Sequence, residues 1–401
     1  MTGLACAAIA LVAHPPARAD DGAGLLDALE QTTPLVDVRL RSETVGQYGK
    51  PGTAEAVTVR GRFGFETGNW EGTSLLAEGV ALTPLDDDYN STFNGRTQYP
   101  IVADPETYQL NRLQLSNTSL PDTTLLVGRS RINLDDQRFI GNVGWRQLEQ
   151  TFDAAQLITT AIPDVTVDLT YLNRINRVYG NRSPQGTYRG DNYLANAAVA
   201  TPIGKLVAFA YLLDFDIDPT DSTATYGLRF AGDRPAGAVD FGYSVSYATQ
   251  HDRANNPLRF HADYWEGQLS AAVHGVTAAV GAEILGGNGV KGFTTPLATL
   301  HQFQGWAEQF LTHPPNGIDD RYGSIGYAIR HVAGVFDAIS AAAVYHDFRS
   351  ARLDIGYGSE IDVMVKATWK RFALLVEYAD YSARRYSTDT HKLWAEIDYV
   401  L

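Results

Sequence analysis

Arginines recur two residues apart in the first third of the chain, and this spacing could build a surface that binds anions. The clearest case is the stretch from Leu125 to Ala155, where Arg129 and Arg131 share one face if the segment is a β-strand. Guanidinium groups stay charged and bind carboxylates through paired hydrogen bonds. The same spacing recurs in two earlier segments, and Arg112 lies on the polar face of another expected strand. The candidate pore-lining arginines are therefore Arg39, Arg41, Arg60, Arg62, Arg112, Arg129, Arg131 and the nearby Arg138.

Acidic side chains fall on the same face as these arginines, most clearly Glu66, Glu149 and Asp153. Two interpretations are open. The arginines could form a cationic strip that selects an anionic solute, or they could pair with the carboxylates in a neutral ladder that braces the wall. The two are compatible, because a ladder with excess arginine still selects anions, and charges inside a membrane protein suggest function by default.

The elements that must position these residues are strands, because the whole chain repeats an alternation of apolar and polar residues. About eighteen segments of roughly ten residues alternate in this way, which is the length of a tilted membrane strand. Short links such as Gly68–Gly72 and longer ones such as Asn133–Arg146 and Gly286–Asp320 follow one another in turn. The sequence therefore predicts an all-β protein, a transmembrane antiparallel up-and-down β-barrel of about eighteen strands.

The cost of placing charge in lipid decides which way the strands face. A charged side chain on the lipid face costs about 2–4 kcal/mol near the midplane of the membrane, so all the arginines are expected to face the lumen. The opposite faces are expected to contact lipid. They include the run Val207, Phe209, Tyr211, Leu213 and Phe215, and in the stretch after Arg146 they include Leu148, Phe152 and Ala154.

The two ends of the chain suggest export to an outer membrane. Residues 1–19 read as a signal peptide, with a short apolar run and an Ala17-Arg18-Ala19 cleavage site, and residues 20–33 as a periplasmic lead-in that is a short helix or disordered. The barrel is then residues 34–401. Its last strand ends in Tyr399 and Leu401, which suits the barrel assembly machinery as a partner, with outer-membrane lipid and lipopolysaccharide as the surroundings.

The long link Gly286–Asp320 is unusually apolar for an outer loop. Six of its residues fall at helical spacing, which predicts a helix: Leu297, Leu300, Phe303, Trp306, Phe310 and Leu311. The loop could fold into the mouth of the barrel as a constriction or lid, or it could pack on neighbouring loops; its length and apolarity favour the first. The candidate lid residues are Lys291, Phe293, His301 and Trp306.

Other kinds of site find little support in the sequence. Asp86, Asp88 and Asn90 resemble the start of a calcium loop, but Ser91 and Thr97 replace its glycine and glutamate, so a solvated acidic loop is the better interpretation and no metal is expected. No H-E-x-x-H or G-x-S-x-G motif occurs, and we expect neither an enzyme nor a cofactor. The arginines lie on period-two strands rather than in a basic domain, so no nucleic-acid partner is expected.

Four stretches of the chain resemble the alginate export family of outer-membrane proteins: DVRLRSETV, TVRGRFGFETG, LLVGRSRINLDDQRFIGNVGWRQLEQTFDA and GVKGFTTPLATLHQFQGWAEQFLTHPPNGIDD. The resemblance implies an 18-stranded barrel whose arginine-rich interior passes an anionic uronate polysaccharide outward. By position it assigns that role to Arg39, Arg41, Arg60, Arg62, Arg129, Arg131 and Arg138.

The sequence thus leads to three functional hypotheses. The first is an outer-membrane channel of a Gram-negative bacterium that passes anionic sugars or polysaccharide by diffusion or export. The second is an uptake porin for small organic solutes. The third, from a different class, is a barrel enzyme or an adhesin. The net charge of −14 does not decide among them, because much of it lies in loops.

Overall fold

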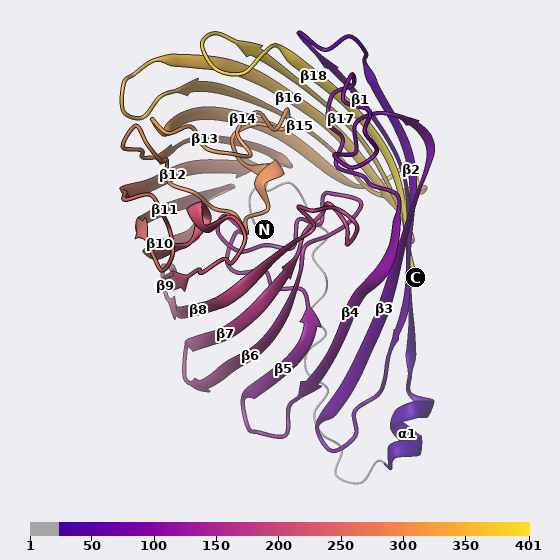
Figure 1. The fold of residues 1–401 in the computed structure, drawn as a ribbon. Helices are drawn as coiled ribbons and strands as arrows, with labels where there is room; N and C mark the ends of the chain where they lie inside the picture. Colours follow the sequence, from indigo (N-terminus) through magenta and orange to yellow (C-terminus); the bar gives the residue numbers. More distant parts are fainter. Residues whose placement is uncertain (1–23) are drawn as a thin grey trace.

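The computed structural model describes residues 24–401, which form one closed antiparallel β-barrel of 18 strands (Figure 1). Each strand pairs with its neighbours in the chain, and β1 closes the ring against β18. Within the described residues no helix is long and apolar enough to cross a membrane. The strands are β1 Thr33–Gln47, β2 Ala54–Glu66, β3 Thr73–Asp88, β4 Thr107–Asn117, β5 Thr123–Ser130, β6 Thr151–Ile162, β7 Val165–Asn176, β8 Thr187–Thr201, β9 Gly204–Leu212, β10 Thr223–Ala236, β11 Val239–Asp252, β12 His261–Val273, β13 Val276–Leu285, β14 Ile318–Val332, β15 Phe336–Arg349, β16 Gly356–Trp369, β17 Phe372–Ala383 and β18 Thr390–Val400.

The predicted fold class and strand number are confirmed. The two ends of the barrel differ, as the alternation of links predicts: one end has short turns such as 163–164, 202–203 and 370–371. The other end carries the long loops, among them 131–150 and 286–317. Outer-membrane barrels have short periplasmic turns and longer extracellular loops, so the long-loop end is the extracellular end.

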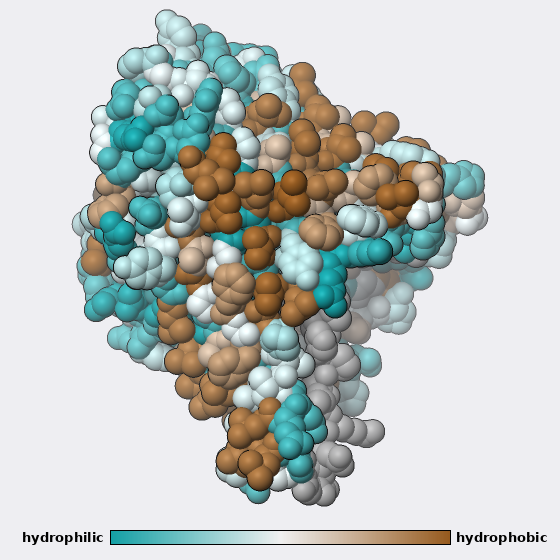
Figure 2. Space-filling model, turned by 90° about the vertical axis from the view of Figure 1, so that its right-hand side faces the viewer, coloured by the Kyte–Doolittle hydropathy of each residue, from teal (hydrophilic) through white to brown (hydrophobic). Residues whose placement is uncertain are grey.

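The outward face of the barrel is an apolar belt. On β16 the exposed side chains Ile361, Val363 and Val365 alternate with the buried Asp362 and Met364. Figure 2, which views the right-hand side of Figure 1, shows apolar side chains gathered over the middle of that face and hydrophilic ones at its upper end. This arrangement suits lipid around the middle of the wall and water at the loops.

Three strands, β5, β6 and β9, face opposite to their predicted direction. On β9 the side chains of Val207, Phe209 and Tyr211 are buried in the lumen, whereas the prediction placed them in lipid. The alternate residues of β9, such as Leu206, are also apolar, so the pattern alone could not choose a side. The aromatic side chains face inward because a loop residue, Phe139, packs against Phe209 with ring centroids 4.8 Å apart.

The N-terminal segments precede the barrel. The predicted signal peptide, 1–19, lies outside the described residues. In the predicted lead-in, Leu25–Glu30 is a short helix, α1, and β1 begins at Thr33, one residue before the predicted barrel. The helix lies at the periplasmic end of the barrel (Figure 1).

Candidate functional site in the barrel lumen

Two extracellular loops fold into the lumen and contact each other there. We call the β5–β6 loop (131–150) and the β13–β14 loop (286–317) the constriction loops; both lie within the ring of strands in Figure 1. Backbone hydrogen bonds join them, since Gly141 donates to the carbonyl of Leu297 over 2.8 Å and Thr299 donates to that of Gln137 over 3.1 Å. The loops therefore narrow the channel as one body.

Arg138 is the central link between the constriction loops and the barrel wall. Its side chain, 1% exposed, forms an ion pair with Glu283 of β13. It also donates to Thr295 Oγ1 over 2.9 Å and to Gln304 Oε1 over 3.2 Å, both in the other loop. A buried guanidinium with this many acceptors fixes the position of both loops at once.

Trp145 joins the β5–β6 loop to β1. Its carbonyl accepts hydrogen bonds from Arg39 Nη1 (3.0 Å) and Arg41 Nη1 (2.8 Å). The Arg41 guanidinium lies 4.4 Å from the centre of the Trp145 ring, and the ring stacks on His301 with centroids 3.9 Å apart. Two of the predicted pore-lining arginines therefore position a loop.

The β13–β14 loop is bound to the inner wall of the barrel by acidic residues of β16 and β17. The backbone N–H of Trp306 donates to Asp362 over 3.3 Å, and that of Ala307 donates to Glu360 over 2.6 Å, both on β16. His301 Nε2 lies 3.5 Å from Glu377 on β17. These carboxylates were not among the predicted site residues, although their i, i+2 spacing places Glu360 and Asp362 on the inward face.

A second set of charges, with Glu308 at its centre, holds the same loop against β18. Glu308 pairs with Arg146 of the other constriction loop and with Lys392 of β18, whose Nζ is 2.8 Å from Oε2. Burial opposes ionisation of Glu308, but Arg146 and Lys392 outweigh it and lower its pKa well below the usual range. Glu308 is therefore an ionised, charge-compensated tie between both loops and the wall.

We call the inward-facing arginines of β1, β2 and β4 the arginine wall. Each lies within 4.0 Å of a carboxylate oxygen. Arg131, at the start of the β5–β6 loop, binds Glu149 over 2.6 Å, and Glu149 is also 3.7 Å from Arg62. Burial raises the pKa of Glu149, but Arg131 and Arg62 together lower it well below the usual range. The members of the arginine wall are Arg39, Arg41, Arg60, Arg62 and Arg112.

Two predicted pore-lining residues lie on the outside of the barrel. Arg129 pairs with Asp153 over 2.6 Å, and both alternate with inward residues, Ser130 and Phe152, that are buried. The strand predicted to carry Glu149 and Asp153 on one face begins only at Thr151, so Glu149 belongs to the loop while Asp153 faces outward. A charged side chain on the lipid face costs only about 0–1 kcal/mol near the membrane interface. Arg129 and Asp153 lie there, at the extracellular ends of β5 and β6, so their outward placement is tolerated.

The remaining predicted site residues are spread over the lumen and loops. Glu66 faces inward at the periplasmic end of β2, far along the strand from the loops. Lys291 pairs with Asp221 of the β9–β10 loop over 2.7 Å. Phe293, His301 and Trp306 are buried where the β13–β14 loop enters the lumen.

The helix predicted in the β13–β14 loop is absent apart from one 3₁₀ turn, Leu300–Gln302. Gln304, Gly305 and Glu308 have positive φ angles, which a right-handed helix cannot contain. Their apolar neighbours bury against the wall in an irregular path instead. The prediction of a helix was wrong because helical spacing and loop packing produce the same apolar pattern.

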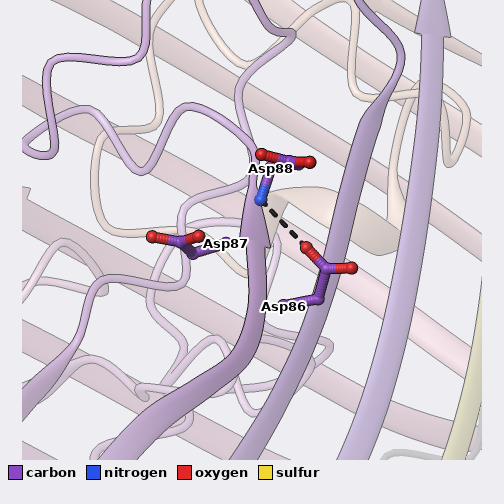
Figure 3. A group of neighbouring side chains, drawn as sticks. All are labelled: Asp86, Asp87 and Asp88. Atoms are coloured by element: carbon purple, nitrogen blue, oxygen red, sulfur yellow. Dashed lines mark hydrogen bonds between the residues drawn. The ribbon is translucent and has the colours of Figure 1, made fainter.

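The acidic group at the end of β3 already has a cationic partner from the protein. Asp86, Asp87 and Asp88 are exposed neighbours (Figure 3). Arg96 neutralises two of them, with its guanidinium nitrogens 2.8 Å from Asp87 and 2.6 Å from Asp88. The cluster therefore behaves as a solvated, ion-paired loop terminus.

Comparison with solved structures finds the same barrel in porins of Pseudomonas aeruginosa. The structure of OpdK with vanillate aligns with a TM-score of 0.70 at 13% identity, covering 93% of this chain and 99% of that one. OpdL aligns at 0.72 and 16% identity, with the same coverage. OccK8 (OprE) aligns at 0.70 and 14% identity, again over 93% and 99%. No family model and no curated protein sequence matches the chain.

These likenesses correct the resemblance to the alginate export family. The matching barrels are OpdK, OpdL and OccK8, and none of the four stretches that suggested alginate export is supported by a family match. The assignment to that family is wrong, and so are the expectations of polysaccharide passage that came with it. What the comparisons and the apolar belt establish is the architecture: a porin-type barrel of the outer membrane of a Gram-negative bacterium.

Proposed function

We propose that the chain is a passive uptake channel for small organic solutes. The observation that carries this proposal is the pair of constriction loops, which are hydrogen-bonded to each other and to the inner wall of the barrel at β1 and β16. A bore reduced in this way admits small molecules and hinders a polymer. The proposal involves no catalytic step, because the solute crosses by diffusion down its gradient.

The charge pattern of the arginine wall supports a small-solute channel over a polyanion channel. Each arginine of the wall has a carboxylate partner, so the wall carries little uncompensated positive charge along which a chain of uronates could slide. Polar but balanced walls suit solutes that bind weakly and leave. The similar barrel OpdK was crystallised with vanillate, a small aromatic carboxylate, which makes small carboxylates the first solutes to test here.

The test is solute entry into proteoliposomes. The folded barrel is reconstituted, and swelling is followed with vanillate, benzoate, a neutral pentose and a uronate oligomer in the outer buffer. We expect entry of the three small solutes at rates well above those of empty liposomes and no entry of the oligomer. Equal entry of the oligomer, or no protein-dependent entry of any solute, would overturn the proposal.

A further inference from the structure

The outside of the barrel carries a row of charges that the channel does not use. At the extracellular ends of four adjacent strands, Arg129, Asp153, Arg174 and Arg189 are direct cross-strand partners, from β5 to β8. We call these four residues the outer-rim row. Cross-strand partners lie about 5 Å apart on one face of a sheet, so the row is continuous.

The outward direction of the row follows from its neighbours in the chain. Ser130, Phe152, Ile175 and Tyr188 each adjoin a member of the row and are buried on the lumen side. The next cross-strand partner of Arg129, Leu113 on β4, is 45% exposed, as expected for a side chain in the apolar belt. The row therefore faces the surrounding membrane.

The positive charge of the row is incompletely paired. Arg129 is bound to Asp153, but among residues 24–401 no carboxylate oxygen lies within ion-pair distance of Arg174 or Arg189, and Arg174 Nε has no hydrogen-bond partner. Carboxylates near these two arginines are not in ion-pair contact with them: Asp191 accepts a hydrogen bond from Tyr171 over 2.6 Å, and the exposed Asp216 contacts Arg189 only through the backbone, by donating its N–H to the Arg189 carbonyl. Of the three guanidinium groups in the row, only that of Arg129 is in an ion pair within the described residues.

Other outward-facing arginines at the rim of the barrel do have carboxylate partners, so unpaired arginines are not a general feature of the rim. On β14 and β15, Arg321 lies 3.0 Å from Asp319 and Arg349 lies 3.0 Å from Asp347. Those arginines are neutralised on their own strands. The outer-rim row differs because it keeps two arginines available for an external anion.

An apolar groove lies directly below the outer-rim row, on the same four strands and β9. It has a volume of about 510 Å³, within the range of roughly 300–1,000 Å³ that is typical of ligand pockets. Two cross-strand rows line it. The upper row is Val127, Ala155, Tyr171, Tyr193 and Leu212, and the lower row is Leu125, Leu157, Leu169, Ala195 and Ala210.

The shape of the groove comes from its small residues. Ala155, Ala195 and Ala210 leave the space that the larger flanking side chains, such as Tyr171 and Tyr193, enclose. The groove faces lipid along the strands, and its upper end opens two residues below the row on β5 and β6, three below it on β7 and four below it on β8. A ligand that fills both must have an apolar chain and an anionic head at the extracellular interface.

We propose that the outer-rim row and the groove form a binding site for lipid A, the phosphorylated glycolipid of the outer leaflet. One acyl chain lies in the groove, and a phosphate of the head group accepts hydrogen bonds from Arg174 and Arg189. Charge complementarity favours lipid A over a second copy of the barrel as the occupant. A second copy would place another apolar belt, and not an anion, against the two unpaired arginines. The inference rests on the barrel and its outward face, and it does not depend on what the lumen transports.

The experiment measures binding of bis-phosphorylated lipid A to the folded, full-length barrel in detergent by native mass spectrometry. The double variant R174Q/R189Q is expected to weaken binding at least tenfold. The double variant A155F/A210F fills the groove without changing charge, and it is expected to weaken binding by a similar factor. The matched control R321Q alters an outward rim arginine that already has a partner, and its binding is expected to stay within twofold of the parent.

Each alternative has its own signature. Equal lipid A binding by all four proteins overturns the proposal, and so does equally tight binding of phosphatidylglycerol, which belongs to the opposite leaflet. If A155F/A210F converts a dimer to a monomer while lipid A binding persists, the groove is an interface between copies and the proposal fails. Heat-modifiable migration on gels identifies any variant that has not folded, and the single variants R189Q and A210F then replace it.

Discussion

Replacing Arg138 with methionine removes the guanidinium that joins the two constriction loops to β13. The change leaves Glu283 buried without its cation, and it leaves Thr295 and Gln304 without a donor. Removing one partner of a buried ion pair costs about 3–5 kcal/mol. Since about 1.4 kcal/mol is a factor of ten, the population with undocked loops rises by roughly 10²–10⁴-fold.

Single-channel recording in planar bilayers detects this change. We expect R138M to show frequent transitions to a higher conductance, because each undocking event widens the bore. The matched control is R259M, which alters a side chain that is 86% exposed and pairs with Asp252; such surface pairs contribute about 0–1 kcal/mol, so its recordings should match the parent.

The double variant R138M/E283Q distinguishes the effect of leaving Glu283 as an unpaired buried charge from general unfolding of the barrel. Glu283 also accepts a hydrogen bond from Tyr264 over 2.8 Å, and glutamine keeps an acceptor there without a buried charge. The double variant should therefore open less often than R138M alone. Recordings of R138M that cannot be distinguished from the parent would refute the role of Arg138 in holding the loops.

Three further predictions concern the same loops. W145A removes the aromatic ring that lies between Arg41 and His301, and it should raise the current noise of the open state in single-channel recordings. Unchanged noise would contradict this prediction. G305A adds a Cβ at a positive φ where it would meet the Glu360 carboxylate, and it should increase thermolysin cleavage of the β13–β14 loop; cleavage at the parent rate would contradict this. Burial, aided by Arg138, lowers the pKa of His313 from 6.5 to about 3. Docking stability is therefore full above pH 6.5 and is lost as the pH falls toward 3, by about 3 kcal/mol at pH 4.5. The parent should open more often at pH 4.5 than at pH 7, and H313Q should lack this step.

The fold was predictable because it depends on a local signal repeated many times. Alternation such as Ile361, Asp362 and Val363 fixes both the strand and its facing, and the cost of charge in lipid fixes which face is inward. The alternation of short and long links then indicated the topology. Each strand is a weak signal, but eighteen of them in one order agree on a single architecture.

The candidate site was less predictable because it depends on contacts between distant segments. Phe209 and Tyr211 on β9 face the lumen because a loop from elsewhere in the chain covers them, and no local pattern contains that information. Likewise Arg131 and Arg129, two residues apart, face different surroundings because the strand ends at Ser130. The apolar character of the β13–β14 loop did indicate a segment that folds inward, although its helical spacing did not produce a helix.

The resemblance to alginate export failed for a related reason. Short arginine-rich strands and an apolar inward loop follow from the physics of a narrowed barrel, so they recur in channels with different solutes. The pairing of each wall arginine with a carboxylate, which sequence spacing alone left open as one of two interpretations, is what separates a braced wall from a track for a polyanion.

The size limit of the channel tests the central claim most directly. Proteoliposome swelling is measured with a series of neutral sugars from pentose to pentasaccharide, for the parent and for a variant in which residues 296–307 are replaced by a short glycine-serine link. The account predicts a steep fall in entry beyond the monosaccharides for the parent and a cut-off at larger size for the variant. A parent that admits pentasaccharide as readily as pentose, or a cut-off that does not move when the loop is removed, would contradict it.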